Sequence, residues 1–224
     1  MSKGNIMASG RRYKFQGSFI GVLVDYDATS PSKAITAITK ANPAVVTSAG
    51  HGLVDGDVVH ITGVLGMTEV NGTSFIVNSL SSSTFELVDT NSTGYGTYVS
   101  GGLFDVATFS NFCELTGYNR TGGSSPEQDA TSLCSVSKEY EIGLPDMGTT
   151  QIDFNFAPQT AIQLALKAFD TSKELMAVKV ILPNSGGTMV QLGFVQQLSE
   201  QVANQGLWTG SVTIRNTGPR YDIA

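Results

Sequence analysis

Between Ala34 and Gly102 the sequence repeats one short pattern, and this repeat limits the fold more than any other feature. Short runs rich in Val, Ile, Thr and Phe are separated by turn signals such as Asp55-Gly56 and Asn71-Gly72. None of these runs has the 3.6-residue period of a helix. We therefore predict a small all-β sandwich or barrel. Its expected strands are AITAIT, AVVTSA, DVVHITGV, SFIVNSL, TFELVD and YGTYVSG.

The remainder of the chain predicts a second β unit. A strand is expected over Tyr13–Asp25, a strand region over LFDVATFSNFCELTG, and a long polar loop at YNRTGGSSPEQDAT. Three long strands close the chain, in ELMAVKVIL, GTMVQLGFVQQLSEQV and GLWTGSVTIRN. In the last of these, Trp208 shares an apolar face with Val212 and Ile214.

The segment TQIDFNFAP alternates apolar and polar residues, so one face of this strand should be core and the other solvated. A helix is predicted directly after it, over Gln159–Phe169, with Pro158 suited to the first turn. The residues Ile162, Ala165, Leu166 and Phe169 form the apolar stripe of this helix. It is the only helix that the sequence predicts with a clear pattern.

These patterns define the expected domain organisation. Residues 1–12 form a flexible N-terminal arm, residues 13–31 and 103–224 form the main β domain, and residues 32–102 form an inserted β domain. The fold class is mainly β, with one α-helix.

Charge and hydropathy exclude several classes of function. The net charge is −6, with 13 basic and 19 acidic residues, so the chain has no cationic surplus for gripping nucleic acid. The longest apolar runs, such as FIGVLV, are far shorter than the roughly 20 residues of a membrane span. A soluble protein made in the cytosol is expected, with no membrane partner. Only 14% of the residues are charged, which suggests that other subunits cover much of the surface.

Four residues of the inserted domain could serve as metal ligands: His51, Asp55, Asp57 and His60. Turn and strand roles explain all four, because Asp55 opens an Asp-Gly turn and His60 falls in the alternating run DVVHITG. We expect no metal site, no cofactor site and no catalytic residues.

Enzymatic activity is not expected from the other motifs either. Both histidines lie in the inserted domain, whereas Cys113 and Cys134 lie outside it, and no G-x-S-x-G elbow occurs. Acidic pairs such as Asp25 with Asp27 are typical of a solvated strand face rather than of a glycosidase. The two cysteines are expected to be free, packed thiols.

The second half resembles a known structural family. The strand ending ELTGYN, the segment DATSLCSVSKEYEIGLPDMGTTQIDFNFAP, the strands around PNSGG and the C-terminal WTGSVTIRNTGP resemble the major tail tube proteins of long-tailed, non-contractile (siphovirus-type) bacteriophages. The resemblance covers Tyr13–Asp27 and Leu103–Ala224. It implies a tail-tube-type β sandwich or barrel with one helix.

The inserted domain, with the rhythm ANPAVVT, GHGL, GM and TFEL, resembles a small β domain of phage virion proteins. It also resembles the β-barrel half-domain of ubiquitin-activating enzymes, which implies nothing catalytic. In a tube, the size of this domain would place it on the outer surface.

The tail tube resemblance implies a structural virion protein. Hexameric rings would self-assemble into a tube in the host cytoplasm, and the finished virion tail would conduct DNA during ejection without binding it specifically. The implied partners are further copies of the chain, a tape-measure protein in the lumen, and tail terminator and distal tail proteins.

Two sets of residues have expected roles in such a tube. Gln151, Asp153 and Asn155, on the polar face of their strand, would face the lumen. Ring stacking would use opposite charges on the N-terminal arm and the long loop, namely Arg11, Arg12, Arg120, Glu127 and Asp129.

Other functions remain open at this point. One is another virion protein of related fold, namely a tail terminator, a distal tail adaptor or the tube protein of a contractile tail. Another, from a different class, is a two-domain β adhesin or carbohydrate-binding protein, although the position of Trp208 on an apolar strand face argues mildly against it.

Overall fold

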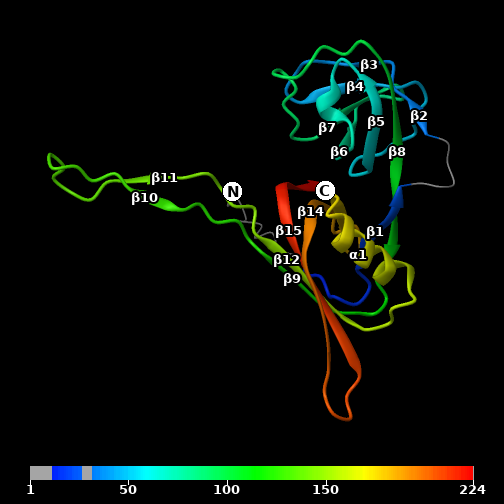
Figure 1. Ribbon diagram of the computed structural model, residues 1–224, viewed down its shortest axis with the longest axis vertical. Coiled ribbons are helices and arrows are strands. Elements are labelled where there is room, and N and C mark those ends of the chain that lie inside the picture. The colour runs from blue at the N-terminus through cyan, green and yellow to red at the C-terminus, as the bar shows by residue number, and fades with distance from the viewer. Residues whose placement is uncertain (1–11, 27–31, 224) are drawn as a thin grey trace, which may run out of the picture.

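The computed structural model describes residues 12–26 and 32–223. It confirms a mainly β protein, and the described residues contain one α-helix. Figure 1 shows a small β domain packed on a larger sheet body, with a long hairpin arm and a second hairpin projecting from that body. The strands of the domain and the body form one path of antiparallel neighbours, in the order β3-β4-β7-β6-β5-β8-β1-β13-β14-β15-β12-β9.

The small domain consists of short strands, as its repeated pattern predicts. They are β2 (Lys33–Ala34), β3 (Ala37–Ile38), β4 (Ala44–Thr47), β5 (Val58–Leu65), β6 (Thr73–Ser79), β7 (Thr84–Leu87) and the first half of β8 (Ser100–Asn111). A short 3-10 helix, η1 (Thr68–Val70), lies between β5 and β6. The run YGTYVSG was expected to be a strand, but it is irregular up to Val99. The hydroxyl of Tyr98 lies within hydrogen-bond distance of both Ile35 O and Gly101 O and holds that segment as a loop instead.

One short segment brings the two ends of the small sheet together. β2 pairs with β8, Thr36 N–H then donates to Thr47 O at 2.9 Å, and β3 pairs with β4. Residues 33–38 therefore bridge β8 and β4, which gives the domain the form of a small barrel. Its own core contains Phe85 and Phe104, whose rings pack edge to face at 5.3 Å.

The body is built from long strands and the helix. Its strands are β1 (Phe19–Tyr26), the second half of β8, β9 (Leu115–Thr121), β12 (Thr149–Asn155), β13 (Met176–Ile181), β14 (Thr188–Val202) and β15 (Trp208–Ile223). On β12 the predicted alternation is confirmed, because Ile152 and Phe154 are buried. Helix α1 (Ala161–Ser172) packs on β1 and β14 with the predicted stripe inward.

The bounds of two elements differ from the predictions. β1 begins at Phe19 rather than Tyr13, because Ser18 N–H closes a turn onto Phe15 O at 3.2 Å. Helix α1 begins after Thr160, two residues beyond the expected start, and continues past Phe169 until Lys173 adopts a left-handed conformation with φ of 57°. No Pro or Gly interrupts residues 161–172, so the helix has no reason to end earlier.

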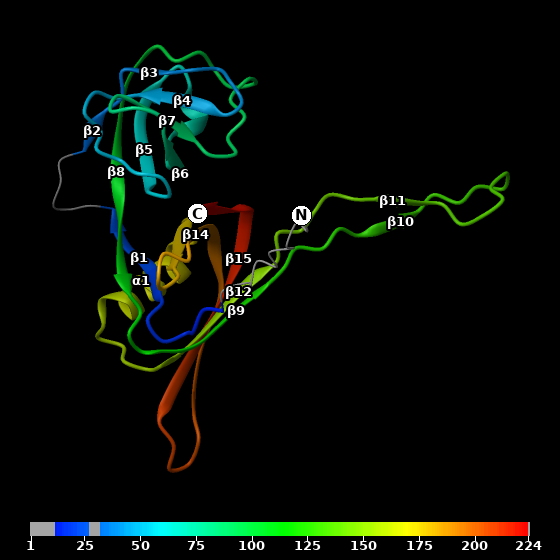
Figure 2. The ribbon, with the colours of Figure 1, turned by 180° about the vertical axis from the view of Figure 1, so that it is seen from behind.

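Strand β8 belongs to both parts of the molecule and crosses the expected boundary at residues 102–103. Its first half pairs with β5, and Ala107 to Asn111 pair with β1 (Figure 2). Val58 and Ile76 of the small domain lie in the buried core of the body. Asp57 and Lys179 form an ion pair across the same seam, with an Nζ–Oδ1 distance of 3.5 Å. The small domain is therefore packed against the body along this seam.

Candidate functional site

The four candidate metal ligands of the small domain have structural roles in its turns and strands. His51 is buried, its Nε2 donates to Ser81 O at 2.7 Å, and its Nδ1 accepts from Leu53 N–H at 3.0 Å. Asp55 accepts from Ser79 N–H at 2.8 Å, and Asp57 accepts from Val54 N–H at 2.9 Å. Among the described residues, no group of three or more His, Cys, Asp or Glu side chains could hold a metal ion.

His60 belongs to a polar cluster at the seam between the two parts. Its ring lies 4.9 Å from the ring of Tyr26, and its Nδ1 lies 3.3 Å from the hydroxyl of Ser74. The Tyr26 hydroxyl also bonds to Ser74. Burial raises the pKa of Tyr26 above 10.0, against the opposing effect of the Ser74 hydrogen bond. A cavity of about 290 Å³ beside this cluster is also lined by Glu174 and Phe194.

The three polar residues of β12 lie on the strand face opposite Ile152 and Phe154. Gln151 Nε2 donates to Asp153 Oδ1 at 2.9 Å, and Asn155 is exposed. Gln151 and Asp153 line a shallow polar cavity of about 330 Å³. Sequence alternation therefore identified a shared polar face.

The five residues expected at ring contacts are spread over three segments. Arg11 lies outside the described residues, and Arg12 is exposed. Arg120, on β9, is half-buried and donates to Gln191 Oε1 at 3.3 Å. Glu127 and Asp129 are exposed on β10. Within the described chain, Arg120 forms no ion pair with either acid.

The hairpin arm, residues 122–147, is the main exposed apolar feature of the chain. It contains β10 (Glu127–Asp129) and β11 (Tyr140–Ile142), which pair with each other. Figure 1 shows it extending away from the rest of the molecule. Its large apolar side chains are Leu133 (105% exposed), Val136 (103%), Leu144 (89%), Ile142 (76%) and Tyr140 (53%). A lone chain leaves all of these side chains in water.

The base of the arm is fixed to the body. Ser124 and Asp146 form a backbone bridge, and Asp146 accepts from Arg215 at 2.6 Å and from Gly148 N–H at 2.8 Å. These contacts hold the pKa of Asp146 below its ordinary value, first through the Gly148 hydrogen bond and then through Arg215. A side chain at Gly123 would bring its Cβ within 2.2 Å of Asp146 O, so the strands can approach here only through glycine.

The sequence predicted a polar loop for the first part of this arm and missed its apolar content. The missed signal is the alternation in SKEYEIGL. Tyr140, Ile142 and Leu144 are two residues apart, so in an extended strand they would lie on the same face. Both cysteines are free, as expected, but they are exposed rather than packed. Cys134 lies in the arm, where no core exists to cover it.

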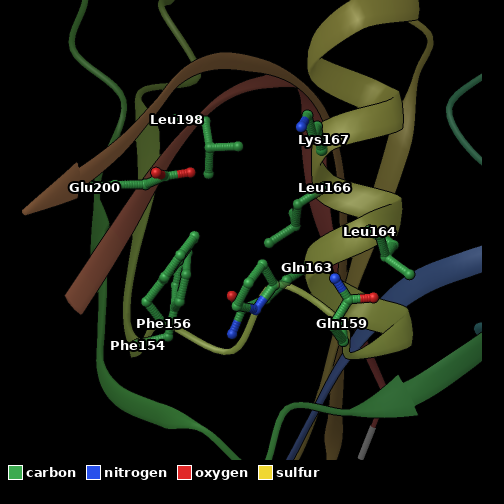
Figure 3. A pocket seen from close by; sticks show the side chains of 10 residues that line it. Phe154, Phe156, Gln159, Gln163, Leu164, Leu166, Lys167, Leu198 and Glu200 are labelled. Atoms are coloured by element: carbon green, nitrogen blue, oxygen red, sulfur yellow. The ribbon is translucent and has the colours of Figure 1, made fainter. Parts of the chain in front are cut away.

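A second apolar surface lies between helix α1 and strand β14 (Figure 3). This α1–β14 groove has a volume of about 170 Å³ and is lined by Phe154, Phe156, Leu164, Leu166 and Leu198. Lys167 stands at its helix side and Glu200 at its strand side. The ring of Trp208 packs at a tilt against the ring of Phe156, with centroids 5.9 Å apart. Trp208 is 53% exposed, so about half of this side chain is in solvent although an apolar face was expected.

Comparison with known proteins finds a similarity in the small domain. Residues 41–108 match the family model of the ubiquitin-activating enzyme E1 FCCH domain. The match lies within the small barrel and the first part of β8. We refer to this part as the FCCH-like domain.

Two curated relatives agree with this match. The chain is 38% identical over 87 residues to ubiquitin-like modifier-activating enzyme 1 of Oryctolagus cuniculus. It is 36% identical over 87 residues to the enzyme of the same name from Homo sapiens. In both cases the similarity covers 37% of this chain and 8% of the relative. The chain thus spans a small fraction of the length of these relatives.

These findings correct the tail tube interpretation. They point to a domain related to ubiquitin E1, and they confirm the resemblance to the half-domain of ubiquitin-activating enzymes. The assignments as a siphovirus tail tube protein, a terminator, a distal tail adaptor or a carbohydrate-binding adhesin are wrong. So are the stacked hexameric rings, the tape-measure and tail partners, the passage of DNA and the location in a virion tail.

The physical reason for the error lies in the motifs used. The segments around PNSGG and WTGSVTIRN combine alternating strand residues with turn residues, and every long antiparallel hairpin favours this combination. Such a pattern identifies the element but not the family.

Among the described residues, no helix is long and apolar enough to cross a membrane.

Proposed function

We propose that this chain is a non-enzymatic docking protein that presents its hairpin arm to a partner protein. The observation that carries the proposal is the full exposure of Leu133 and Val136, with Leu144 nearly as exposed. Several large apolar side chains exposed on one short segment are typical of a site for another macromolecule. The anchored base of the arm holds this surface away from the body.

The charge of the arm restricts the partner. Residues 122–147 contain five carboxylates and one cation, Lys138. A partner with an apolar surface bordered by basic residues would match both the side chains and the charge of the arm. Such a partner protein is the occupant that we propose.

The backbone of the arm supports the same role. β10 and β11 pair over only three residues each, and neither strand has a second neighbour among the described residues. An isolated two-stranded hairpin is only marginally stable in water. A partner that adds a strand or covers the apolar side chains would therefore order the arm.

The polar residues of the FCCH-like domain support a role without catalysis. His51, Asp55 and Asp57 each bond to backbone groups that shape their own loops. In the matched enzymes this domain corresponds to 8% of the chain, so their activity is not carried over.

The first partner to test is ubiquitin, because the matched relatives are named for ubiquitin-like modifiers. Isotope-labelled ubiquitin would be titrated with the parent chain and followed by NMR. The arm variant would carry Leu133→Ser, Val136→Ser and Leu144→Ser. The control variant would carry Val54→Ser, Leu65→Ser and Leu80→Ser, which replace exposed apolar residues of the FCCH-like domain.

Shifts in ubiquitin that the arm variant abolishes and the control retains would support the proposal. Shifts that only the control abolishes would move the docking surface to the FCCH-like domain. A partner-independent measurement accompanies the titration, namely binding of a hydrophobic dye to the three proteins. Equal dye fluorescence for the parent and the arm variant would contradict an accessible apolar arm.

A further inference from the structure

The α1–β14 groove is lined by strands β12 and β14, helix α1 and the turn that joins β12 to α1. Phe154 and Leu166 are 2% and 0% exposed and form its buried floor. Gln163 fixes the adjoining chain, because its Nε2 donates to Asn155 O and its Oε1 accepts from Ala157 N–H, both at 2.9 Å. The groove therefore exists before any occupant arrives.

The size and the walls of the groove define what fits. Its volume of about 170 Å³ is close to that of an apolar cavity of roughly 150 Å³ that accepts benzene. The rings of Phe154 and Phe156 both line the groove, and aromatic pairs gain from edge-to-face or offset packing. A single aromatic ring is the occupant that matches both properties.

The rim of the groove carries two opposite charges. Lys167 and Glu200 are exposed, and neither forms an ion pair within the part of the chain that the structure describes. Figure 3 shows them on opposite sides of the apolar lining residues. An occupant with an acidic group on one side of its ring and a basic group on the other would satisfy both.

The apolar surface continues beyond the cavity. Leu164 at its edge is 50% exposed, and Trp208 on the far side of Phe156 is 53% exposed. A free small molecule would fill the cavity and leave these side chains in water. A peptide segment that anchors one ring in the groove would cover them as well.

We propose that the α1–β14 groove binds a phenylalanine-sized aromatic side chain from a peptide segment of a partner protein, with Lys167 and Glu200 selecting opposite charges beside the anchor. This site is separate from the arm. Evidence against the proposed docking function of the arm would not count against this groove, and the reverse also holds.

The test uses Trp208, the only tryptophan of the chain, as an internal reporter beside the groove. The probes are the pentapeptides acetyl-Ser-Glu-Phe-Lys-Ser-amide and acetyl-Ser-Lys-Phe-Glu-Ser-amide, which lack tryptophan. A control pair has Ala in place of Phe. Each peptide is titrated into the full chain at low salt while tryptophan emission is recorded.

We expect saturable emission changes with the Phe peptides, stronger for one charge order, and none with the Ala peptides. Glu200→Lys and Lys167→Glu, both at exposed positions, should each weaken the preferred peptide by about two- to five-fold. The double charge exchange should reverse the preference between the two Phe peptides. The arm variant should bind them as the parent does.

Three results would overturn the proposal. The first is the absence of saturable change with either Phe peptide, and the second is equal change with the Ala peptides. The third is the loss of peptide binding in the arm variant, which would place the peptide on the arm instead. Failure of ubiquitin to bind the arm would not change how these three results of the peptide titrations are interpreted.

Discussion

Tyr26 is a partly buried polar side chain at the seam, and its hydroxyl has a hydrogen-bond partner there. Its hydroxyl bonds to Ser74 across the seam, and burial raises its pKa above 10.0. The folded state therefore favours the neutral phenol. The stability that this contributes is complete below pH 10 and is lost as the pH rises through the folded pKa.

Replacing Tyr26 with Phe tests this contribution. At pH 7 the free energy of unfolding should fall by about 1 kcal/mol, because Ser74 loses one of its two hydrogen-bond partners and keeps only His60. Above pH 10 the decline in stability should become shallower than in the parent. Denaturant unfolding from pH 7 to 11 measures both effects. Tyr140→Phe, at an exposed arm position, is the control and should change neither.

A second residue-scale prediction concerns Gln205, in the turn between β14 and β15. Gln205 has φ of 64°, a conformation that glycine adopts more easily than other residues. Gln205→Gly should raise the free energy of unfolding by about 0.5 kcal/mol. Gln201→Gly, in the extended part of β14, should lower it. A loss of stability at both positions in thermal unfolding would show that the turn is not strained.

At the scale of elements, the arm depends on a few contacts at its base. The ion pair between Arg215 and Asp146, with an N–O distance of 2.6 Å, joins the arm to β15. The Gly148 hydrogen bond and Arg215 both lower the pKa of Asp146 below 3.8. The contribution of this carboxylate is thus present above pH 3.8 and is lost as the pH falls through the folded pKa.

Asp146→Asn should loosen the base of the arm while leaving the body folded. Hydrogen-exchange protection factors at residues 122–147 should be lower than in the parent at pH 7, and their further decrease between pH 5 and 3 should be smaller than in the parent. Asp222→Asn removes a comparable ion pair with Arg220 outside the arm and serves as the matched control. Equal exchange in the arm for both variants would show that Asp146 does not anchor it.

At the scale of the whole molecule, the FCCH-like domain and the body share a strand and a core. β8 pairs with strands of both parts, and Val58 and Ile76 are buried in the core of the body. The FCCH-like domain also has a core of its own. Because the shared strand and these two side chains couple it to the body, we expect one cooperative unfolding transition.

Gly56 provides a test of this coupling. It has φ of 79°, and a Cβ there would lie 2.3 Å from Ile223 Cδ1 and 3.3 Å from Val190 Cγ2. Gly56→Ala should lower the free energy of unfolding by about 2–3 kcal/mol, through backbone strain and overpacking of the seam. Gly72→Ala has a similar φ of 71° with open space around it, so it should lose only about 1 kcal/mol. Equal losses in chemical denaturation would show that the seam tolerates the added methyl group.

Much of the fold was predictable because it depends on local patterns. The alternation on β12 and the stripe of helix α1 place apolar side chains on one face, and burial of that face follows directly. The turns at Asp55-Gly56 and Asn71-Gly72 were equally local. The division into a small β domain and a larger β unit was drawn from the spacing of strands and turns, and its bounds stay a prediction.

The candidate sites were mostly unpredictable, because they depend on which distant segments meet. The groove joins residues of β12, α1 and β14, and the Tyr26 cluster joins β1 with the FCCH-like domain. Nothing local marks Leu166 as a groove floor or Ile76 as part of a shared core.

The sequence by itself determined the β class, the position of the helix and the strand periodicity, because these follow from the interactions of neighbouring residues. Only the tertiary structure decided that β8 joins two cores, that the loop after β9 is an exposed apolar arm, and that α1 and β14 enclose a groove. Burial is a property of the packed chain, so the apolar character of Leu133 does not by itself show that this side chain is fully exposed.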